Sequence, residues 1–395
     1  MIASVNGMNS DDRRKARRAR REAARGRKKA ERNAGCDLEA VADLNALHKA
    51  ARQAARGVSW KASVQRYHAD VLRNVVKARS DLLEGRDVSR GFIRFDLYER
   101  GKLRHISAVH FSERVIQKSL TQNALVPAIT PSLVLDNSAN LKGRGTDFAI
   151  ARLKKQLACF HRKHGTDGYV LLVDFSDYFA RIAHEPAKAI VSAALEDDRL
   201  VALEHRLIDA QGDIGLGLGS EPNQILAVAF PSSIDHFVQE MCGVEAYGRY
   251  MDDSYCIHSD KAYLQVVQLL IEHKCEELGI VINRRKTRIV RLSRGFTFLK
   301  KKFSFAENGR IVVRPSRESV TRERRKLKKQ RKMVEAGLMT PEHVERSYQS
   351  WRGGMKRLDA HRTVLSMDAL YRELFSTSEN AQRGGVIEIA LPRAA

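Results

Sequence analysis

The chain has 395 residues, of which 43% are hydrophobic, enough to bury a core in two or three lobes. Lysine and arginine number 70 against 47 aspartates and glutamates, a formal net charge of +23. Like charges repel in a compact protein, so this excess argues against a protein with no charged partner and favours a polyanionic one, most often nucleic acid. The five scattered cysteines include no CxxC pair, which argues against a disulfide framework or a structural zinc site. With no apolar run near ~20 residues and no signal core, we expect a cytoplasmic protein without a membrane span.

The N-terminus predicts a basic arm over residues 1–35. Residues 11–32 carry twelve Lys or Arg and four Asp or Glu, but no apolar stripe that would dock a helix. We expect this arm to be disordered, or helical only where it lies on phosphates. Its deletion should then weaken nucleic-acid binding with a strong dependence on salt. A solvated tail with no specific role is the alternative.

Helical periodicity follows the arm up to about residue 85. Residues 92–109 then alternate in polarity around a turn at Glu99–Lys102 and predict a β-hairpin. Residues 114–129 have apolar side chains at helical spacing, and we expect this helix to stop near Pro127 and Pro131.

The clearest strand in the chain is residues 169–173, YVLLV, which predict a buried central strand closed by Asp174. A strand–turn–strand later in the chain carries Asp252 and Asp253 at its tip. Between the two, a glycine-rich loop at 214–220 leads into a helix.

The C-terminal third begins with an amphipathic helix at 261–280, then a short strand and a hairpin at 295–305. A strongly basic helix is predicted at 316–337. Thr340 gives a clean helix start, because a cap, a proline and an acid follow one another.

Three aspartates therefore stand at strand ends, and carboxylate oxygens are the ligands that hard divalent cations prefer. Transfer of a nucleotide to a 3′-hydroxyl uses two such ions held on one rigid platform. Taken singly, Asp174 and the pair Asp252 and Asp253 would be ordinary turn residues. Their order and their places at predicted strand ends favour a shared metal site.

Asp174–Phe179, DFSDYF, and Tyr250–Asp253, YMDD, resemble the catalytic motifs of reverse transcriptases, the RNA-directed DNA polymerases. The resemblance runs from about residue 90 to residue 375. It implies a right-hand α+β polymerase with fingers, a palm of antiparallel sheet plus helices, and a helical basic thumb. The expected divisions are the arm at 1–35, N-terminal helices and fingers at 36–165, palm at 166–300, thumb at 301–375 and a tail at 376–395.

The resemblance also implies the catalytic set. Two Mg²⁺ ions, with Mn²⁺ as a substitute, are expected on Asp174, Phe175, Asp252 and Asp253. Lys286, in the segment NRRKT, resembles the lysine that protonates the leaving pyrophosphate, so it is a candidate general acid. A solvated lysine is the alternative.

Seven positions resemble the family's deoxynucleotide site. Phe179 is expected to exclude a ribose 2′-hydroxyl, and Lys102 and Arg104 to grip the triphosphate. A core aromatic and surface charges on a turn are the respective alternatives. The full set is Lys102, Arg104, Asp177, Tyr178, Phe179, Gly219 and Gln224.

Further positions are expected to contact the RNA template and the RNA/DNA hybrid. They lie in the fingers, beside the YMDD aspartates, in a primer-grip hairpin and on the basic thumb helix, which would grip phosphates without reading sequence. They are Arg114, Lys142, Arg144, Tyr250, Met251, Phe298, Arg324, Arg325 and Lys328.

The glycine-rich motif departs from most reverse transcriptases. Leu218 stands where the family has glutamine, and Asn223-Gln224 replaces Ser-Pro. This is similar to the enzymes of diversity-generating retroelements, which implies low fidelity opposite template adenines. Such an enzyme would work with a structured non-coding RNA and a small basic accessory protein. An enzyme of anti-phage defence or of a retron-like element, and a non-catalytic RNA-binding protein, are the alternatives. Ala180 and Ala183 also depart from the family pattern, where an aspartate and a proline are common. The aspartate is not a metal ligand in the family, so activity should survive its absence.

Overall fold

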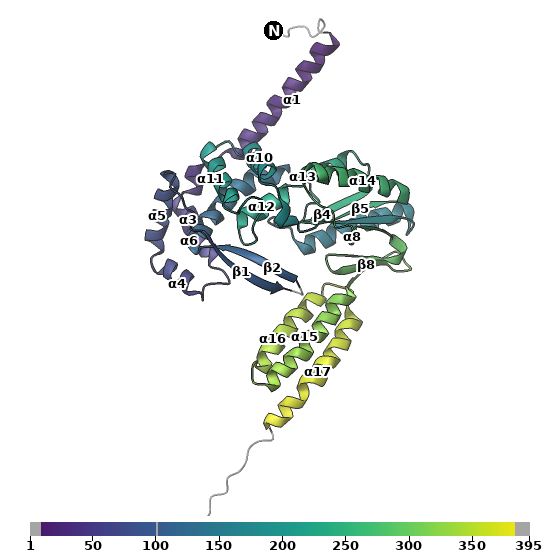
Figure 1. Cartoon of the computed structure of the whole chain (residues 1–395). Coiled ribbons are helices and arrows are strands. Elements are labelled where there is room, and N and C mark those ends of the chain that lie inside the picture. The colour runs from purple at the N-terminus through teal and green to yellow at the C-terminus, as the bar shows by residue number, and fades with distance from the viewer. Residues whose placement is uncertain (1–8, 100–101, 384–395) are drawn as a thin grey trace, which may run out of the picture. The chain divides into compact units, whose positions relative to one another are not determined.

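The computed structural model describes residues 9–99 and 102–383, which form an α+β fold of helices and small sheets (Figure 1). The chain divides into two compact units. The first contains the described residues up to Arg152 together with Val173–Cys256 and Gln265–Arg288. The second contains Leu153–Leu172, Ile257–Leu264 and the described residues from Ile289 onward. The division into fingers, palm and thumb stays a prediction.

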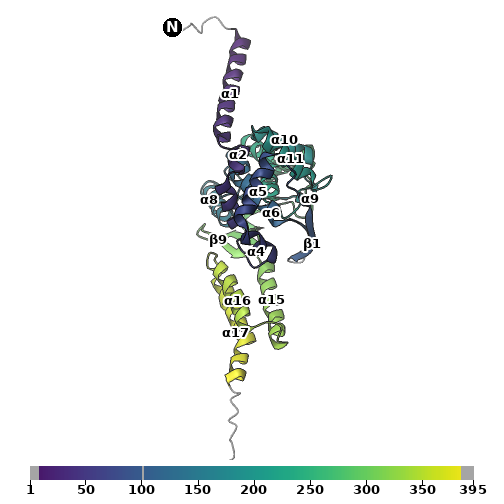
Figure 2. The ribbon, with the colours of Figure 1, turned by 90° about the vertical axis from the view of Figure 1, so that its left-hand side faces the viewer.

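The predicted disorder of the N-terminal arm is wrong, because Ser10–Asn33 forms helix α1 (Figures 1 and 2). Alanine and arginine favour helix, and Asn9 caps it by accepting a hydrogen bond from the Asp12 N–H at 2.8 Å. None of its residues is buried. Its last turn is tied to the first unit, where Asn33 Nδ2 donates to the Ala194 carbonyl at 2.9 Å. Hydrophobic periodicity could not predict α1, because periodicity detects helices that bury an apolar face and α1 has none.

The helix predicted over residues 114–129 is present and ends near Pro127 and Pro131, as expected. It begins as α6 (Phe111–Leu120). It passes through a π-helical turn at Thr121–Leu125 into α7 (Val126–Ile129), and Pro127 lies in the first turn of α7. Since the first turn of a helix has unbonded N–H groups, proline fits there without loss of a hydrogen bond.

The other helices before the C-terminal bundle include the periodic segments expected from the sequence. They are α2 (Leu38–Val41), α3 (Leu44–Ala54), α4 (Ala62–Ala69), α5 (Val71–Leu83), α8 (Thr146–His164), α9 (Tyr178–Arg181), α10 (His184–Ala194), α11 (Asp198–Asp209), α12 (Glu221–Ala229), α13 (Ser232–Glu240) and α14 (Lys261–Glu277).

The predicted hairpin is confirmed as β1 (Phe92–Glu99) and β2 (Lys102–Val109), antiparallel with Glu99 opposite Lys102. Its turn, residues 100–101, lies outside the described residues. A four-stranded sheet has the order β4-β5-β3-β6. Its strands are β3 (Tyr169–Asp174), β4 (Ala246–Tyr250), β5 (Asp253–His258) and β6 (Arg288–Arg291).

A three-stranded antiparallel sheet, β7 (Phe296–Phe298), β8 (Lys301–Phe305) and β9 (Ile311–Pro315), lies in the second unit. The β7–β8 hairpin turns on Leu299 and Lys300, both at positive φ (47° and 60°). Two consecutive left-handed residues make the type I′ geometry that matches strand twist, although glycine or asparagine usually occupies it.

The second unit ends in a bundle of α15 (Arg317–Glu335), α16 (Pro341–Met355) and α17 (His361–Arg383), seen side by side in Figure 2. The predicted tail at 376–395 therefore begins as helix, and residues 384–395 lie outside the described part. The bundle core consists of Leu327, Val344, Tyr348, Met367 and Phe375. Within residues 9–99 and 102–383, no helix has the length and apolarity that a bilayer crossing requires.

Candidate active site

Asp174 and the pair Asp252 and Asp253 come together at the ends of neighbouring strands in the first unit. Asp174 closes β3 and is 6% exposed, while Asp253 opens β5. The Phe175 N–H donates to the Asp252 carbonyl at 3.2 Å, which ties the two backbones at the height of the carboxylates. The side chains of Asp253 and Asp174 share a hydrogen bond. These segments, 78 residues apart in sequence numbering, thus form one acidic cluster.

The cluster is electrostatically crowded. Burial, and then repulsion from Asp252 and Asp174, raise the pKa of Asp253 from 3.8 to about 7. Carboxylates that repel one another in a buried site are stabilised by any cation that enters it.

Lys286 supplies that cation in the structure. Its ammonium lies 2.8 Å from Oδ1 and 2.6 Å from Oδ2 of Asp174. Burial alone would lower the pKa of Lys286, but the hydrogen bonds to Asp174 and the attraction of all three aspartates raise it above its usual value. Sequence reasoning singled out Lys286 for proton transfer and did not anticipate this ion pair.

The donor chemistry fits a hard divalent cation, since carboxylates and the backbone carbonyl of Phe175 offer oxygen alone. Nevertheless, no group of three or more His, Cys, Asp or Glu side chains within residues 9–99 and 102–383 is already arranged to hold a metal ion. Lys286 covers both oxygens of Asp174. A cation bound there requires the ammonium to move away.

The segment after α14 fixes Asp174 from the other side. The Asn283 N–H donates to the Asp174 carbonyl at 2.8 Å, and the Asp174 N–H donates to Thr287 Oγ1 at 3.3 Å. The Ser176 N–H donates to the Val281 carbonyl at 2.7 Å. The NRRKT segment is therefore held by backbone bonds beside the acidic cluster.

The candidate deoxynucleotide residues after Asp174 differ in accessibility. Asp177 is exposed and left-handed, with φ 47°. Tyr178 is buried, and its hydroxyl donates to the Ala227 carbonyl at 2.6 Å, so only its backbone can face a ligand. Phe179 is half-buried and its carbonyl accepts from the Leu216 N–H at 2.8 Å.

The glycine-rich loop packs directly on β2. The Ser107 N–H donates to the Leu218 carbonyl at 3.1 Å. Gly219 has φ +127°, and a Cβ there would lie 2.9 Å from the Ser107 carbonyl oxygen, so only glycine fits. Gln224, on α12, accepts from Asn140 Nδ2 at 3.3 Å. The loop is thereby joined to the hairpin, and α12 to the segment around Asn140.

The basic fingers candidates divide into two groups. Arg104, on β2, and Arg114, on α6, are exposed, as is Lys142. Arg144 instead donates to the carbonyls of Val134 and Asn137, at 3.3 and 2.7 Å, and so holds its own loop. Lys102 begins β2, and its side chain is outside the described part of the structure.

Two candidate nucleic-acid contacts in the first unit, Tyr250 and Met251, directly precede Asp252 and are half-buried. The remaining four candidates, Phe298, Arg324, Arg325 and Lys328, lie in the second unit. Phe298 is only 4% exposed, so any contact of its hairpin with nucleic acid would have to come from exposed neighbouring residues. Arg324, Arg325 and Lys328 are exposed and line a hollow of about 310 Å³ with Thr321, Ser366 and Leu370.

Sequence reasoning missed Arg249 and Asp235, a fully buried pair behind the YMDD turn. The available signal was a charged residue inside a strand whose other residues are mostly apolar, since a buried charge needs a partner. The sequence does not indicate which acid that partner is.

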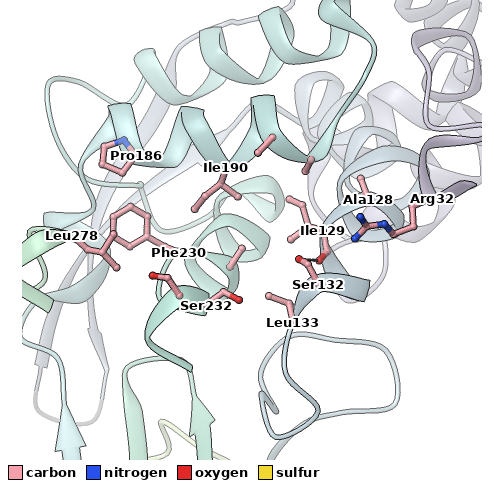
Figure 3. Close-up of a pocket in the computed structure, with 14 residues that line it drawn as sticks. Arg32, Ala128, Ile129, Ser132, Leu133, Pro186, Ile190, Phe230, Ser232 and Leu278 are labelled. Carbon is pink, nitrogen blue, oxygen red and sulfur yellow. Dashed lines mark hydrogen bonds between the residues drawn. The ribbon is translucent and has the colours of Figure 1, made fainter. Parts of the chain in front are cut away.

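A separate pocket of about 340 Å³ lies in the first unit and is mainly apolar (Figure 3). Ile129, Ile190, Phe230 and Leu278 line it, with Arg32 at one side (Figure 3). No motif residue takes part, so this pocket is distinct from the acidic cluster.

No family model matches the chain, and no curated protein matches it. Among solved structures, one similar chain is apo telomerase from Candida tropicalis, truncated from the C-terminal domain, with a TM-score of 0.41 and 16% sequence identity. The match covers 57% of this chain and 55% of that chain, so it spans about half of the telomerase chain. A likeness at this level does not establish a shared fold.

Proposed function

We propose that this protein is an RNA-directed DNA polymerase that extends a DNA primer on an RNA template. The observation that supports the proposal is the convergence of Asp174, Asp252 and Asp253 at adjacent strand ends. Two sequence motifs that resemble those of reverse transcriptases thus meet in one acidic cluster. In this assignment the residues around it belong to a palm, the β1–β2 hairpin to fingers, and α15–α17 to a thumb.

Asp174, Asp252, Asp253 and the carbonyl of Phe175 would hold two Mg²⁺ ions, with Mn²⁺ as a substitute. When bound, the ions supply activation of the primer 3′-hydroxyl and charge neutralisation of the triphosphate. Lys286 would leave Asp174 as they bind, and its ammonium would then be free to protonate the pyrophosphate.

The half-buried ring of Phe179 would occupy the space of a ribose 2′-hydroxyl, so that deoxynucleotides are selected by shape. Gly219 and Gln224 would border the same substrate, and Lys102 and Arg104 would hold its phosphates. Arg324, Arg325 and Lys328 would bind the phosphate backbone of the hybrid duplex.

Primer extension on poly(rA)/oligo(dT) with Mg²⁺ or Mn²⁺ tests the proposal. Wild type is expected to incorporate dTTP, and Asp252→Ala and Asp253→Ala to be inactive. Asp213→Ala changes an exposed aspartate outside the cluster and is expected to match wild type. Equal extension by all variants would refute the assignment.

Lys286 on Asp174 is the observation that favours a second candidate, a non-catalytic RNA-binding protein on the same fold. In that protein the ammonium would be a permanent substitute for a metal. This alternative predicts that wild type binds RNA but extends no primer under any metal condition. The same assay detects the lack of extension, and an RNA-binding measurement on wild type detects the binding.

We further propose that the enzyme works in a diversity-generating retroelement, with a structured RNA and a small basic accessory protein as partners. The support is Leu218 beside Gly219, where a glutamine would give a polar contact near the new base pair. Sequencing of cDNA made on mixed RNA templates is expected to show errors concentrated opposite adenine. An error rate equal across template bases would favour a defence or retron-like enzyme.

A further inference from the structure

The side chain of Arg249 is almost fully buried, with 1% exposed, and each of its three nitrogens donates a hydrogen bond. Nε and Nη2 donate to the two carboxylate oxygens of Asp235, at 2.7 and 2.6 Å. Nη2 also donates to the Val228 carbonyl at 2.7 Å, and Nη1 to the Met251 carbonyl at 3.0 Å. Asp235 is itself fully buried and accepts a third bond, from the Tyr247 hydroxyl at 2.5 Å.

The Met251 carbonyl belongs to the turn that carries the aspartates. Met251 has φ 56°, a left-handed conformation that a non-glycine residue adopts only when its surroundings impose it. Its carbonyl precedes the peptide bond to Asp252. The bond from Arg249 therefore fixes the orientation of the peptide unit that delivers Asp252 and Asp253 to the cluster.

The Val228 carbonyl lies in the last turn of α12, where carbonyls lack partners within the helix and a cation is favoured. The same helix starts beside Gly219 at its other end. One guanidinium thus joins the catalytic turn to the helix of the glycine-rich motif.

The backbone of Arg249 is held as well. Its N–H donates to the Asp136 carbonyl at 3.0 Å, and its carbonyl accepts from the Ser138 N–H at 2.9 Å. The backbone from which the Arg249 side chain extends towards the turn is therefore itself fixed.

Stability alone does not explain this pair. Two buried charges are costly to desolvate, and replacing both with apolar groups of similar size is often neutral or stabilising. The fork of an arginine, in contrast to the single nitrogen of a lysine, can serve a carboxylate and two carbonyls in fixed directions.

We infer that Arg249, oriented by Asp235, is a positioning residue that sets the YMDD turn against α12. The inference rests on the proposed polymerase function and deepens it. Arg249 acts through the peptide after Met251 and does not touch substrate.

The test is the double variant Asp235→Leu/Arg249→Met, which removes both charges and keeps an apolar interior. Its matched control is Arg352→Met/Asp368→Leu, which removes an ion pair of the bundle, with Arg352 Nε 3.1 Å from Asp368 Oδ1. Urea unfolding, hydrogen exchange of the peptide 247–256 and single-turnover dTTP incorporation at saturating primer–template are measured on each.

The double variant is expected to unfold near the wild-type urea midpoint, to exchange faster in peptide 247–256, and to incorporate dTTP about 10²-fold more slowly. The control is expected to keep the wild-type exchange and rate. Arg249→Lys, which keeps the charge but not the fork, is expected to show the same two changes more weakly. It carries the test if the double variant does not fold.

Unchanged exchange and a rate within about twofold of wild type, in a folded variant, would overturn the inference. If wild type itself does not extend a primer, the proposed function fails. The exchange of peptide 247–256 still decides whether Arg249 fixes the turn.

Discussion

Around Asp174 key charged side chains are buried, whereas on the bundle α15–α17 the basic side chains proposed to bind nucleic acid are exposed. In the first region Asp174 and Arg249 are almost inaccessible and bonded to backbone and side-chain partners. In the second, Arg324, Arg325 and Lys328 project from a core of aromatic and aliphatic side chains.

The two regions should respond differently to substitution. A charge in a low-dielectric interior has a large effect that depends on its exact partner, and salt screens it little. Exposed charges have small, additive effects that salt screens. Buried charges can therefore fix the positions of catalytic groups, whereas the exposed charges of the bundle are proposed to hold a polyanion whatever its sequence.

Glu204 offers the strongest test on the buried side. It is fully buried on α11, its carboxylate oxygens have no hydrogen-bond partner within residues 9–99 and 102–383, and burial raises its pKa from 4.5 to about 8. Below pH 4.5 this carboxyl is protonated in both the folded and the unfolded state, so its raised pKa does not change the free energy of unfolding. As pH rises towards 8 the unfolded state ionises first, and the folded protein loses stability. Between pH 4 and pH 9, the free energy of unfolding of Glu204→Gln should therefore rise by about 3 to 5 kcal/mol relative to that of wild type. Denaturant unfolding at the two pH values measures this gain. A difference independent of pH would show that Glu204 is not buried as a neutral acid.

The exposed side is tested by the triple variant Arg324→Ala/Arg325→Ala/Lys328→Ala. Loss of three phosphate contacts should weaken hybrid binding by about 10² to 10³-fold and reduce the slope of log affinity against log salt by about 2 to 3. Fluorescence anisotropy over a salt series measures both. The triple variant of Arg346, Lys356 and Arg357 to alanine makes the same change of net charge at exposed residues that do not line the hollow. Equal losses in the two triple variants would mean that charge alone, and not this surface, binds the duplex.

Phe179 lies between the two regimes, because it is half-buried and is proposed to touch substrate. Phe179→Ala should raise the use of ribonucleotides relative to deoxynucleotides by about tenfold or more. Single-nucleotide incorporation with dTTP and UTP gives the ratio, and Phe179→Tyr should leave it unchanged. An unaltered ratio in Phe179→Ala would return this residue to a packing role.

The smallest expected effect concerns backbone conformation in place of charge. Lys300 is held at φ 60°, which costs less for glycine. Lys300→Gly should stabilise the second unit by about 0.5 to 1 kcal/mol in thermal unfolding. Lys302→Gly, in the adjacent strand, should destabilise it by a similar amount. Effects of the same sign would contradict the turn assignment.

The sequence predicted the features that depend on local pattern. The apolar run before Asp174, the hairpin at 92–109 and the basic helix after Pro315 are all present. It did not predict what depends on distant partners. The ammonium of Lys286 on Asp174 joins residues 112 apart, and no periodicity encodes it. Helix α1 was missed for the opposite reason, because its stability is local and it has no packing partner along most of its length.

Single-turnover dTTP incorporation and hybrid affinity, measured together, test the central claim most directly. Asp174→Asn, Asp252→Asn and Asp253→Asn are compared with the triple variant of Arg324, Arg325 and Lys328. The aspartate variants should bind the primer–template like wild type and incorporate at least about 10³-fold more slowly. The triple variant should bind weakly yet reach the wild-type rate once saturated. Wild-type rates in the aspartate variants would contradict the assignment of the acidic cluster as the catalytic centre.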